Sequence, residues 1–123
     1  MHWLAVAVGG ALGAMARYGV SSIIFNPSSQ KFPWATMSVN VLGSFVMGLL
    51  FVVIVEKAAL PPEMRSLLMI GFLGAFTTFS TFSLIALGLW QNGHLFLALV
   101  YVVATVVLCL VAISGAIWLA RLL

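Results

Sequence analysis

The sequence predicts an all-α membrane protein with four transmembrane helices in a single domain. Of its 123 residues, 64% are hydrophobic and only 6% are charged, whereas a soluble domain carries about 25% charged residues. The mean hydropathy is +1.27. Four apolar segments are each long enough for a bilayer core about 30 Å thick, which needs about 20 helical residues. We therefore expect residues 1–123 to form one membrane domain with no soluble domain beside it.

The four spans are predicted from the apolar segments that lie between polar breaks. Their expected bounds are about 2–25, 34–55, 66–90 and 95–119. The first span lacks the basic start of a signal peptide, so we expect a retained helix. The segments NPSSQKFP, EKAALPPEMR and QNGH separate the spans. An indole favours the headgroup region of the bilayer, and a tryptophan lies near an end of each span: Trp3, Trp34, Trp90 and Trp118.

The charged and titratable residues exclude several classes of protein. A formal charge of +3 is too small to indicate nucleic-acid binding. The single cysteine, Cys109, rules out an internal disulfide and a cysteine-based zinc site, and we expect it to serve in helix packing. The only acids, Glu56 and Glu63, fall in the loop after the second span, which disfavours a proton-coupled exporter because that class needs an intramembrane carboxylate. His2 and His94 lie at predicted span edges, so we do not expect an enzyme.

The distribution of basic residues gives only a weak orientation signal. Lys57, Arg65 and Arg121 would lie on one side of the membrane, and Lys31 on the other, joined by Arg17 if it reaches the interface. Such a chain could insert in both directions, and two opposite copies would form an antiparallel homodimer about an axis in the membrane plane. We expect an oligomer in any case, because four helices can hardly enclose a polar pathway alone.

Polar residues on the second span share one face of the helix. Thr36, Asn40 and Ser44 follow one another at four-residue spacing. Asn40 has two readings: a clamp between helices, or a donor that faces a path filled with water or ligand. Arg17, in the first span, either extends from a helix end to the interface or faces an aqueous vestibule and attracts anions.

The fourth span carries a similar polar stripe. Tyr101, Thr105 and Cys109 follow at four-residue spacing, and Ala112 and Ala116 continue the stripe with small side chains. The stripe could line a narrow path. Hydroxyl groups can also bond back to the carbonyls of their own helix, so the pattern alone leaves both roles open.

The segment GFLGAFTTFSTFS, residues 71–83, combines aromatic rings with hydroxyls inside the third span. On a helix, Phe79 and Phe82 would share one face, and Thr77 and Thr81 would share the opposite one. The edge of an aromatic ring is positive, so the rings could contact a small anion while neighbouring hydroxyls donate hydrogen bonds to it.

The same segment predicts a break near the middle of the third helix. Gly71 and Gly74 invite the break, and we expect Thr77 to take part in it. Non-helical backbone at membrane depth persists only where protein or an aqueous cavity covers it, and the freed carbonyls there could bind a cation.

Three segments resemble the small bacterial fluoride channels of the Fluc (CrcB) family: GGALGAMARYG at 9–19, TMSVNVLGSF at 36–45 and GFLGAFTTFSTFS at 71–83. The resemblance covers essentially the whole chain. It implies a dual-topology antiparallel homodimer in the bacterial cytoplasmic (inner) membrane, with two fluoride pores at the subunit interface. It also implies passive export of fluoride, and therefore fluoride resistance.

The resemblance also implies roles for individual residues. The expected pore residues are Asn40, Phe79, Ser80, Thr81, Phe82, Tyr101 and Thr105; Arg17 and Thr36 are placed in the vestibule. A structural sodium ion is expected at the main-chain carbonyls of Gly74 and Thr77 from both subunits. The chain departs from the family pattern at three places. Ala35-Thr36-Met37 stands where the family often has Gly-Thr-Leu, Ile85 stands where many members have glutamate, and Cys109 stands where a hydroxyl is expected.

Two rival interpretations remain open. A small multidrug-type exporter shares the size, helix count and dual topology, but it needs a membrane-embedded carboxylate. A membrane scaffold without transport activity would use the polar stripes only to hold helices together.

Overall fold

The computed structural model describes residues 2–24 and 32–123, and helices dominate this part of the chain. In chain order, with η denoting a π-helix, the elements are α1 (His2–Ile24), α2 (Trp34–Leu50), η1 (Phe51–Glu56), α3 (Pro62–Met64), η2 (Arg65–Leu73), α4 (Gly74–Phe76), α5 (Phe79–Gln91) and α6 (Leu95–Leu122). The predicted end of the first span at Phe25, and Lys31 in the following loop, lie outside the described residues.

Four helical segments are long and apolar enough to cross a membrane, as predicted. They are His2–Ile24, Trp34–Glu56, Pro62–Gln91 and Leu95–Leu122. The third begins four residues before the expected start at Ser66, because Pro62 occupies the first turn, where a missing backbone N–H costs nothing. The all-α membrane fold is therefore confirmed.

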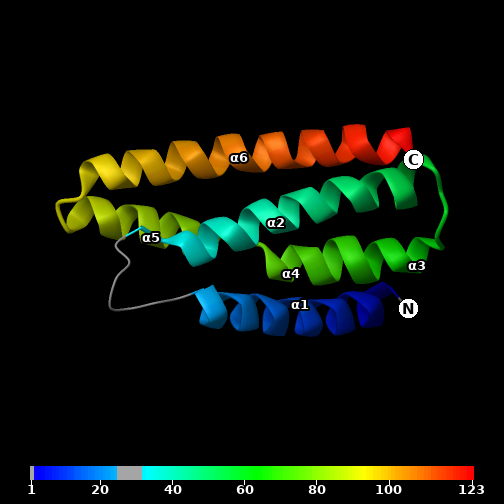
Figure 1. Ribbon diagram of the computed structural model, residues 1–123. Helices are drawn as coiled ribbons and strands as arrows, with labels where there is room; N and C mark the ends of the chain where they lie inside the picture. Colours follow the sequence, from blue (N-terminus) through cyan, green and yellow to red (C-terminus); the bar gives the residue numbers. More distant parts are fainter. Residues whose placement is uncertain (1, 25–31) are drawn as a thin grey trace.

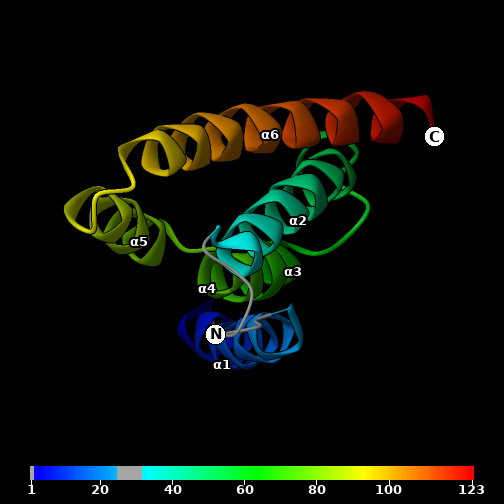
Figure 2. The ribbon, with the colours of Figure 1, turned by 60° about the vertical axis from the view of Figure 1, so that its left-hand side comes forward.

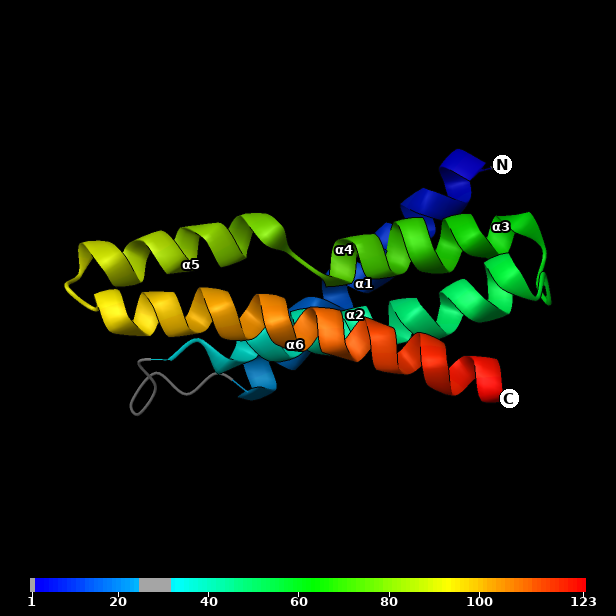
Figure 3. The ribbon, with the colours of Figure 1, turned by 90° about the horizontal axis from the view of Figure 1, so that it is seen from above.

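The helices form a layered bundle around α2. One side of α2 packs along α6, and η2 and α4 lie toward its other side, with α1 packed along the outer face of η2 (Figures 1 and 2). After the break, α5 diverges from α4 and packs beside the N-terminal half of α6, as the view from above shows (Figure 3). Many large apolar side chains of α5 and α6 face outward, which suits surroundings of lipid.

Glycines allow α1 and η2 to pack backbone against backbone. A Cβ atom on Gly9 would collide with the carbonyl oxygen of Leu67, and one on Gly13 would collide with that of Phe72. In lipid no hydrophobic effect drives helices together, so close van der Waals packing of this kind stabilises their association instead. From the opposite helix, a Cβ on Gly71 would lie 2.8 Å from the Val6 carbonyl oxygen.

We expect Gly13→Ala to destabilise the protein by about 1–3 kcal/mol, because the added methyl group forces two packed backbones apart. Thermal unfolding in detergent measures this loss. Gly19→Ala on the same helix is the matched control, since a Cβ there meets nothing within 4 Å. Equal unfolding temperatures for the two variants would contradict the proposed packing role.

The third helix is broken near its middle, as predicted, but the break lies at Thr77 and Thr78 and not at the glycines. Thr77 (φ −84°, ψ 157°) and Thr78 (φ −150°, ψ 121°) are extended. Helix continues through Gly71 and Gly74 and ends at Phe76. The glycines therefore do not form the break, because Gly71 serves the contact with α1. The expectation that Thr77 and Thr81 share a helical face is also wrong, since Thr77 is not helical.

Charged residues join the ends of the second and fourth helices. Arg121 contacts Glu56 through two hydrogen bonds, Nε to Oε1 at 3.0 Å and Nη2 to Oε2 at 2.6 Å. Lys57 Nζ donates to the Ala120 carbonyl at 3.3 Å. Glu56 is the last residue of η1 rather than a loop residue, because the helix runs one residue beyond the expected end.

Candidate functional site

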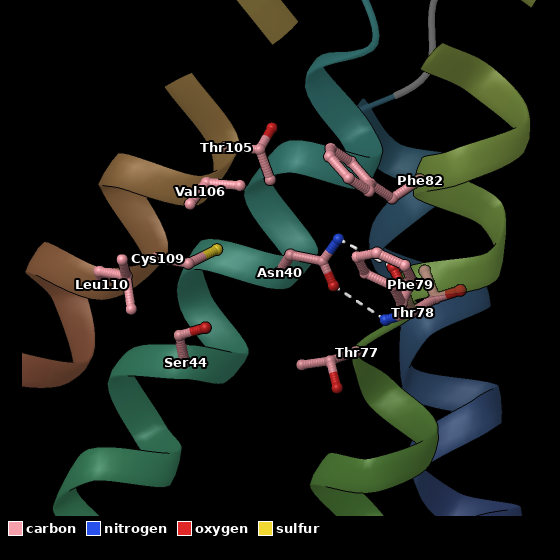
Figure 4. A pocket seen from close by; sticks show the side chains of 10 residues that line it. All are labelled: Asn40, Ser44, Thr77, Thr78, Phe79, Phe82, Thr105, Val106, Cys109 and Leu110. Carbon is pink, nitrogen blue, oxygen red and sulfur yellow. Dashed lines mark hydrogen bonds between the residues drawn. The ribbon is translucent and has the colours of Figure 1, made fainter. Parts of the chain in front are cut away.

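Asn40 ties α2 to the break in the third helix. Its Oδ1 accepts from the Thr78 backbone N–H at 2.8 Å, and its Nδ2 donates to the Thr78 carbonyl at 3.1 Å (Figure 4). The carboxamide thereby replaces the partners that the extended Thr78 backbone would have in a helix. The clamp reading of Asn40 is thus observed. Because an amide nitrogen carries two protons and this bond uses one, a second N–H remains.

The other groups at the break are also hydrogen-bonded. Thr78 Oγ1 accepts from the Thr81 N–H at 3.2 Å and so caps the N-terminus of α5. Thr77 donates to the Leu73 carbonyl through both its N–H (3.0 Å) and its hydroxyl (2.9 Å). Sequence reasoning missed the role of Thr78. Its signal is a threonine directly before a helix, the usual N-cap position.

A cavity of about 300 Å³ lies beside this break. Side chains from α2, the break, α5 and α6 line it (Figure 4): Asn40, Ser44, Thr77, Thr78, Phe79, Phe82, Thr105, Val106, Cys109 and Leu110. The polar stripes predicted on the second and fourth spans therefore meet on its walls. The structure brings four of the predicted pore residues, Asn40, Phe79, Phe82 and Thr105, to one cavity.

The two phenylalanines lie side by side but in different surroundings. Their ring centroids are 5.5 Å apart with an interplanar angle of 44°. Phe82 is 7% exposed and packs on Tyr101 at a centroid distance of 5.1 Å, whereas Phe79 is 77% exposed. Phe82 is therefore part of the core of the chain, while Phe79 stands at the open side of the cavity.

Two hydroxyl groups on α6 are buried without partners. Tyr101 is 0% and Thr105 is 5% exposed, and neither hydroxyl has a hydrogen-bond partner within the described ranges 2–24 and 32–123. Leaving a buried hydroxyl unpaired costs about 1–3 kcal/mol. Thr105 does not bond back to its own helix, and its hydroxyl oxygen has almost no accessible surface in the single chain.

The remaining predicted residues lie outside the wall of the cavity. Ser80 is exposed and Thr81 half-buried on the first turn of α5. Thr36 is half-buried near the start of α2, and Arg17 is half-buried on α1. Tyr101 lies one helical turn before Thr105 and contacts the cavity only through the Phe82 ring.

The backbone at the break has carbonyl oxygens of the kind that bind a cation. The Thr78 N–H, which would bond to the Gly74 carbonyl in an uninterrupted helix, donates to Asn40 instead. The Gly74 carbonyl therefore loses its helical partner, and the Thr77 carbonyl follows in extended backbone. Gly74 is exposed. Carbonyl oxygens of this kind suit a hard cation such as sodium, so the expected residues fit the expected ion.

Comparison with known proteins agrees with the sequence resemblance. The family model described as CrcB-like protein, Camphor Resistance (CrcB), matches residues 4–117. A fluoride-specific ion channel FluC of Saccharophagus degradans is 64% identical over 115 residues, which are 94% of this chain and 86% of the relative. The FluC of Hahella chejuensis is 52% identical over 122 residues, 99% of this chain and 96% of the relative. The chain therefore belongs to the CrcB family.

Proposed function

We propose that the protein is a fluoride-selective channel that exports cytoplasmic fluoride passively through the bacterial cytoplasmic membrane and so confers fluoride resistance. Relatives named fluoride-specific ion channels support this proposal. The observation that carries it is the cavity that Asn40, Thr105, Phe79 and Phe82 line together.

Selectivity follows from the groups that replace the hydration shell of the ion. Asn40 offers its second N–H, Thr105 offers its hydroxyl, and the phenylalanine rings offer positive edges. Ser80 and Thr81 supply further hydroxyls beside the rings, and Tyr101 extends the track along α6. Arg17 and Thr36 belong to the vestibule that attracts the anion. A narrow path built from such donors suits a small anion better than a large one.

A second copy of the chain completes the path. A cavity of about 300 Å³ is about ten times the volume of one water molecule in the liquid, roughly 30 Å³, and fluoride is about the size of water. One chain alone therefore cannot surround the ion. The 77% exposure of Phe79 fits a surface that a partner covers. In the proposal two antiparallel copies enclose two pores.

The same interface would hold the structural sodium ion. The carbonyls of Gly74 and Thr77 from both subunits would bind it, so that the ion neutralises the carbonyl dipoles at the two breaks. The ion would hold the subunits together and would not itself be transported.

Transport requires no energy source in this proposal. Fluoride enters cells as the weak acid HF, ionises in the less acidic cytoplasm and becomes trapped there. A channel releases it down its electrochemical gradient. The rival multidrug-type exporter needs a carboxylate in its transport path. Among the described residues, none of those lining the cavity is acidic, and Glu56 is engaged by Arg121 at the helix end.

Growth of a fluoride-sensitive bacterium that lacks its own fluoride exporter tests the proposal. We expect the expressed protein to restore growth on fluoride, and an equally expressed Phe79→Ile variant to fail. Absence of rescue by membrane-inserted wild-type protein would count against fluoride export.

The mass of the detergent-solubilised protein tests the assembly separately. We expect twice the chain mass of 13.2 kDa, with a C-terminal tag that is accessible from both sides of the membrane. A monomer, or a tag accessible from one side only, would contradict the antiparallel dimer.

A further inference from the structure

Gly43 lies beside the break in the third helix, where its lack of a side chain leaves room for Thr77. It is a buried residue of α2. A Cβ atom on Gly43 would collide with the methyl carbon Cγ2 of Thr77 and would lie 3.3 Å from Cδ2 of Phe76. Phe76 is the last helical residue before the break, and Thr77 is the first extended one. The space at Gly43 is therefore filled by the break itself, whereas Gly9 and Gly13 each face the backbone of η2.

Two hydrogen bonds hold Thr77 in the orientation that places its methyl group toward Gly43. The Thr77 hydroxyl donates to the Leu73 carbonyl at 2.9 Å, and the Thr77 N–H donates to the same oxygen at 3.0 Å. The hydroxyl and the methyl group are both attached to Cβ, so a rotation about χ1 that moved the methyl away from Gly43 would also move the hydroxyl off its acceptor. A side chain at position 43 would therefore break this hydrogen bond or displace the backbone of the break.

One face of α2 thereby contacts both extended residues in turn. Asn40 and Gly43 are three residues apart and share this face. Asn40 bonds to the backbone N–H and carbonyl of Thr78, and Gly43 receives the methyl group of Thr77. In Figure 4 the Thr77 methyl group points toward α2, below the Asn40 carboxamide. The next residue, Phe79, begins α5, so the start of α5 follows from where these two contacts place the break.

We infer that Gly43 is a positioning residue of the pore: its lack of a side chain sets where the Thr77 backbone lies, and with it the start of α5 and the ring of Phe79. The inference rests on the proposed function, in which the Thr77 carbonyl binds the cation and Phe79 contacts fluoride. Gly43 itself touches neither ion and acts through Thr77. We therefore expect a Cβ atom at position 43 to slow fluoride transport although no group that contacts an ion has been changed.

A double-mutant cycle of Gly43→Ala and Thr77→Ser tests the contact. Serine lacks the methyl carbon that the new Cβ would meet, and it keeps both a hydroxyl for the Leu73 carbonyl and the backbone carbonyl. In the wild-type background, Gly43→Ala should slow fluoride efflux from proteoliposomes by at least about tenfold and should lower the unfolding temperature in detergent. In the Thr77→Ser background, whatever the rate of that variant, we expect Gly43→Ala to slow efflux by less than about threefold, because the remaining neighbours lie at 3.3 and 3.7 Å.

Gly48→Ala is the matched control on the same helix. Gly48 is also buried in α2, but a Cβ atom there would lie 2.7 Å from the Ile113 carbonyl oxygen and 2.9 Å from the Cβ of Ala116, both on α6. Gly48 is not among the residues that line the cavity. Because Thr77 takes no part in this contact, Gly48→Ala should change the efflux rate and the unfolding temperature equally with and without Thr77→Ser.

Two results would overturn the inference alone. One is an equal cost of Gly43→Ala in both backgrounds, which would show that Thr77 does not fill the space at Gly43. The other is a lowered unfolding temperature with unchanged efflux through folded Gly43→Ala, which would leave Gly43 with a packing role only.

Two further measurements keep the test decisive. If Gly43→Ala did not fold, recovery of folded protein in the Thr77→Ser background would support the contact, and its absence would contradict it. If the wild-type protein released no fluoride, the proposed function would fail, whereas the unfolding temperatures would still show whether Gly43 and Thr77 are coupled. The two failures are therefore distinguishable.

Discussion

Fluoride efflux through the Asn40→Asp variant is expected to fall by at least about 100-fold, or about 2.7 kcal/mol. Aspartate retains an oxygen that accepts from the Thr78 N–H, but it loses both amide protons. One of those protons holds the Thr78 carbonyl at 3.1 Å, and the other is proposed to face fluoride. Hydrogen bonds to charged groups contribute about 1.5–3 kcal/mol each, and an ionised aspartate would add repulsion of the anion. Ion-electrode measurements on proteoliposomes provide the rate.

Comparison with Asn40→Ser separates the two roles of Asn40. Serine keeps a donor near the cavity, but it is too short to span both backbone groups of Thr78. We therefore expect Asn40→Ser to lower the unfolding temperature in detergent more than Asn40→Asp does. The fluoride efflux rate of Asn40→Ser should nevertheless fall less than that of Asn40→Asp. Normal efflux through folded Asn40→Asp would contradict a donor role for Asn40.

The second large effect concerns the phenylalanine rings. Phe79→Ile and Phe82→Ile retain much of the bulk but remove the positive ring edges, so we expect each to reduce fluoride efflux by at least about tenfold, which is about 1.4 kcal/mol. Phe79 is 77% exposed, so its replacement should hardly affect the packing of the chain. Phe82 is 7% exposed and packs on Tyr101, so its replacement carries a packing cost as well.

Phe76→Ile is the control for that packing cost. Phe76 is 5% exposed, packs with Val39 and Leu73, and does not line the cavity. We expect it to destabilise the protein about as much as Phe82→Ile does while fluoride efflux continues. If Phe76→Ile and Phe82→Ile slowed efflux equally, the effect of Phe82 would be one of packing and not of its ring edge.

Hydropathy and length were sufficient to predict the four helices, because each apolar segment must satisfy its own backbone hydrogen bonds in a bilayer. The position of the break was harder to predict. Glycine is a local signal for irregular backbone, but Gly71 is required for the approach of α1. The group that stabilises the true break is Asn40, which lies 38 residues from Thr78 in the sequence. Local patterns carry no information about a partner that distant.

The candidate site was predictable in part. Four-residue spacing placed Asn40 with Ser44, and Thr105 with Cys109, on common helix faces, and the structure sets these faces around one cavity. Spacing alone could not indicate that the two faces oppose each other, because this depends on how α2 packs against α6. The roles of Ser80, Thr81 and Arg17, and the sodium site, remain predictions from the family resemblance.

Efflux of fluoride and of chloride from proteoliposomes that contain the purified wild-type protein tests the central claim most directly. The account predicts rapid release of fluoride and no release of chloride above that from protein-free liposomes. Chloride release as fast as that of fluoride, or release of neither ion, would contradict it.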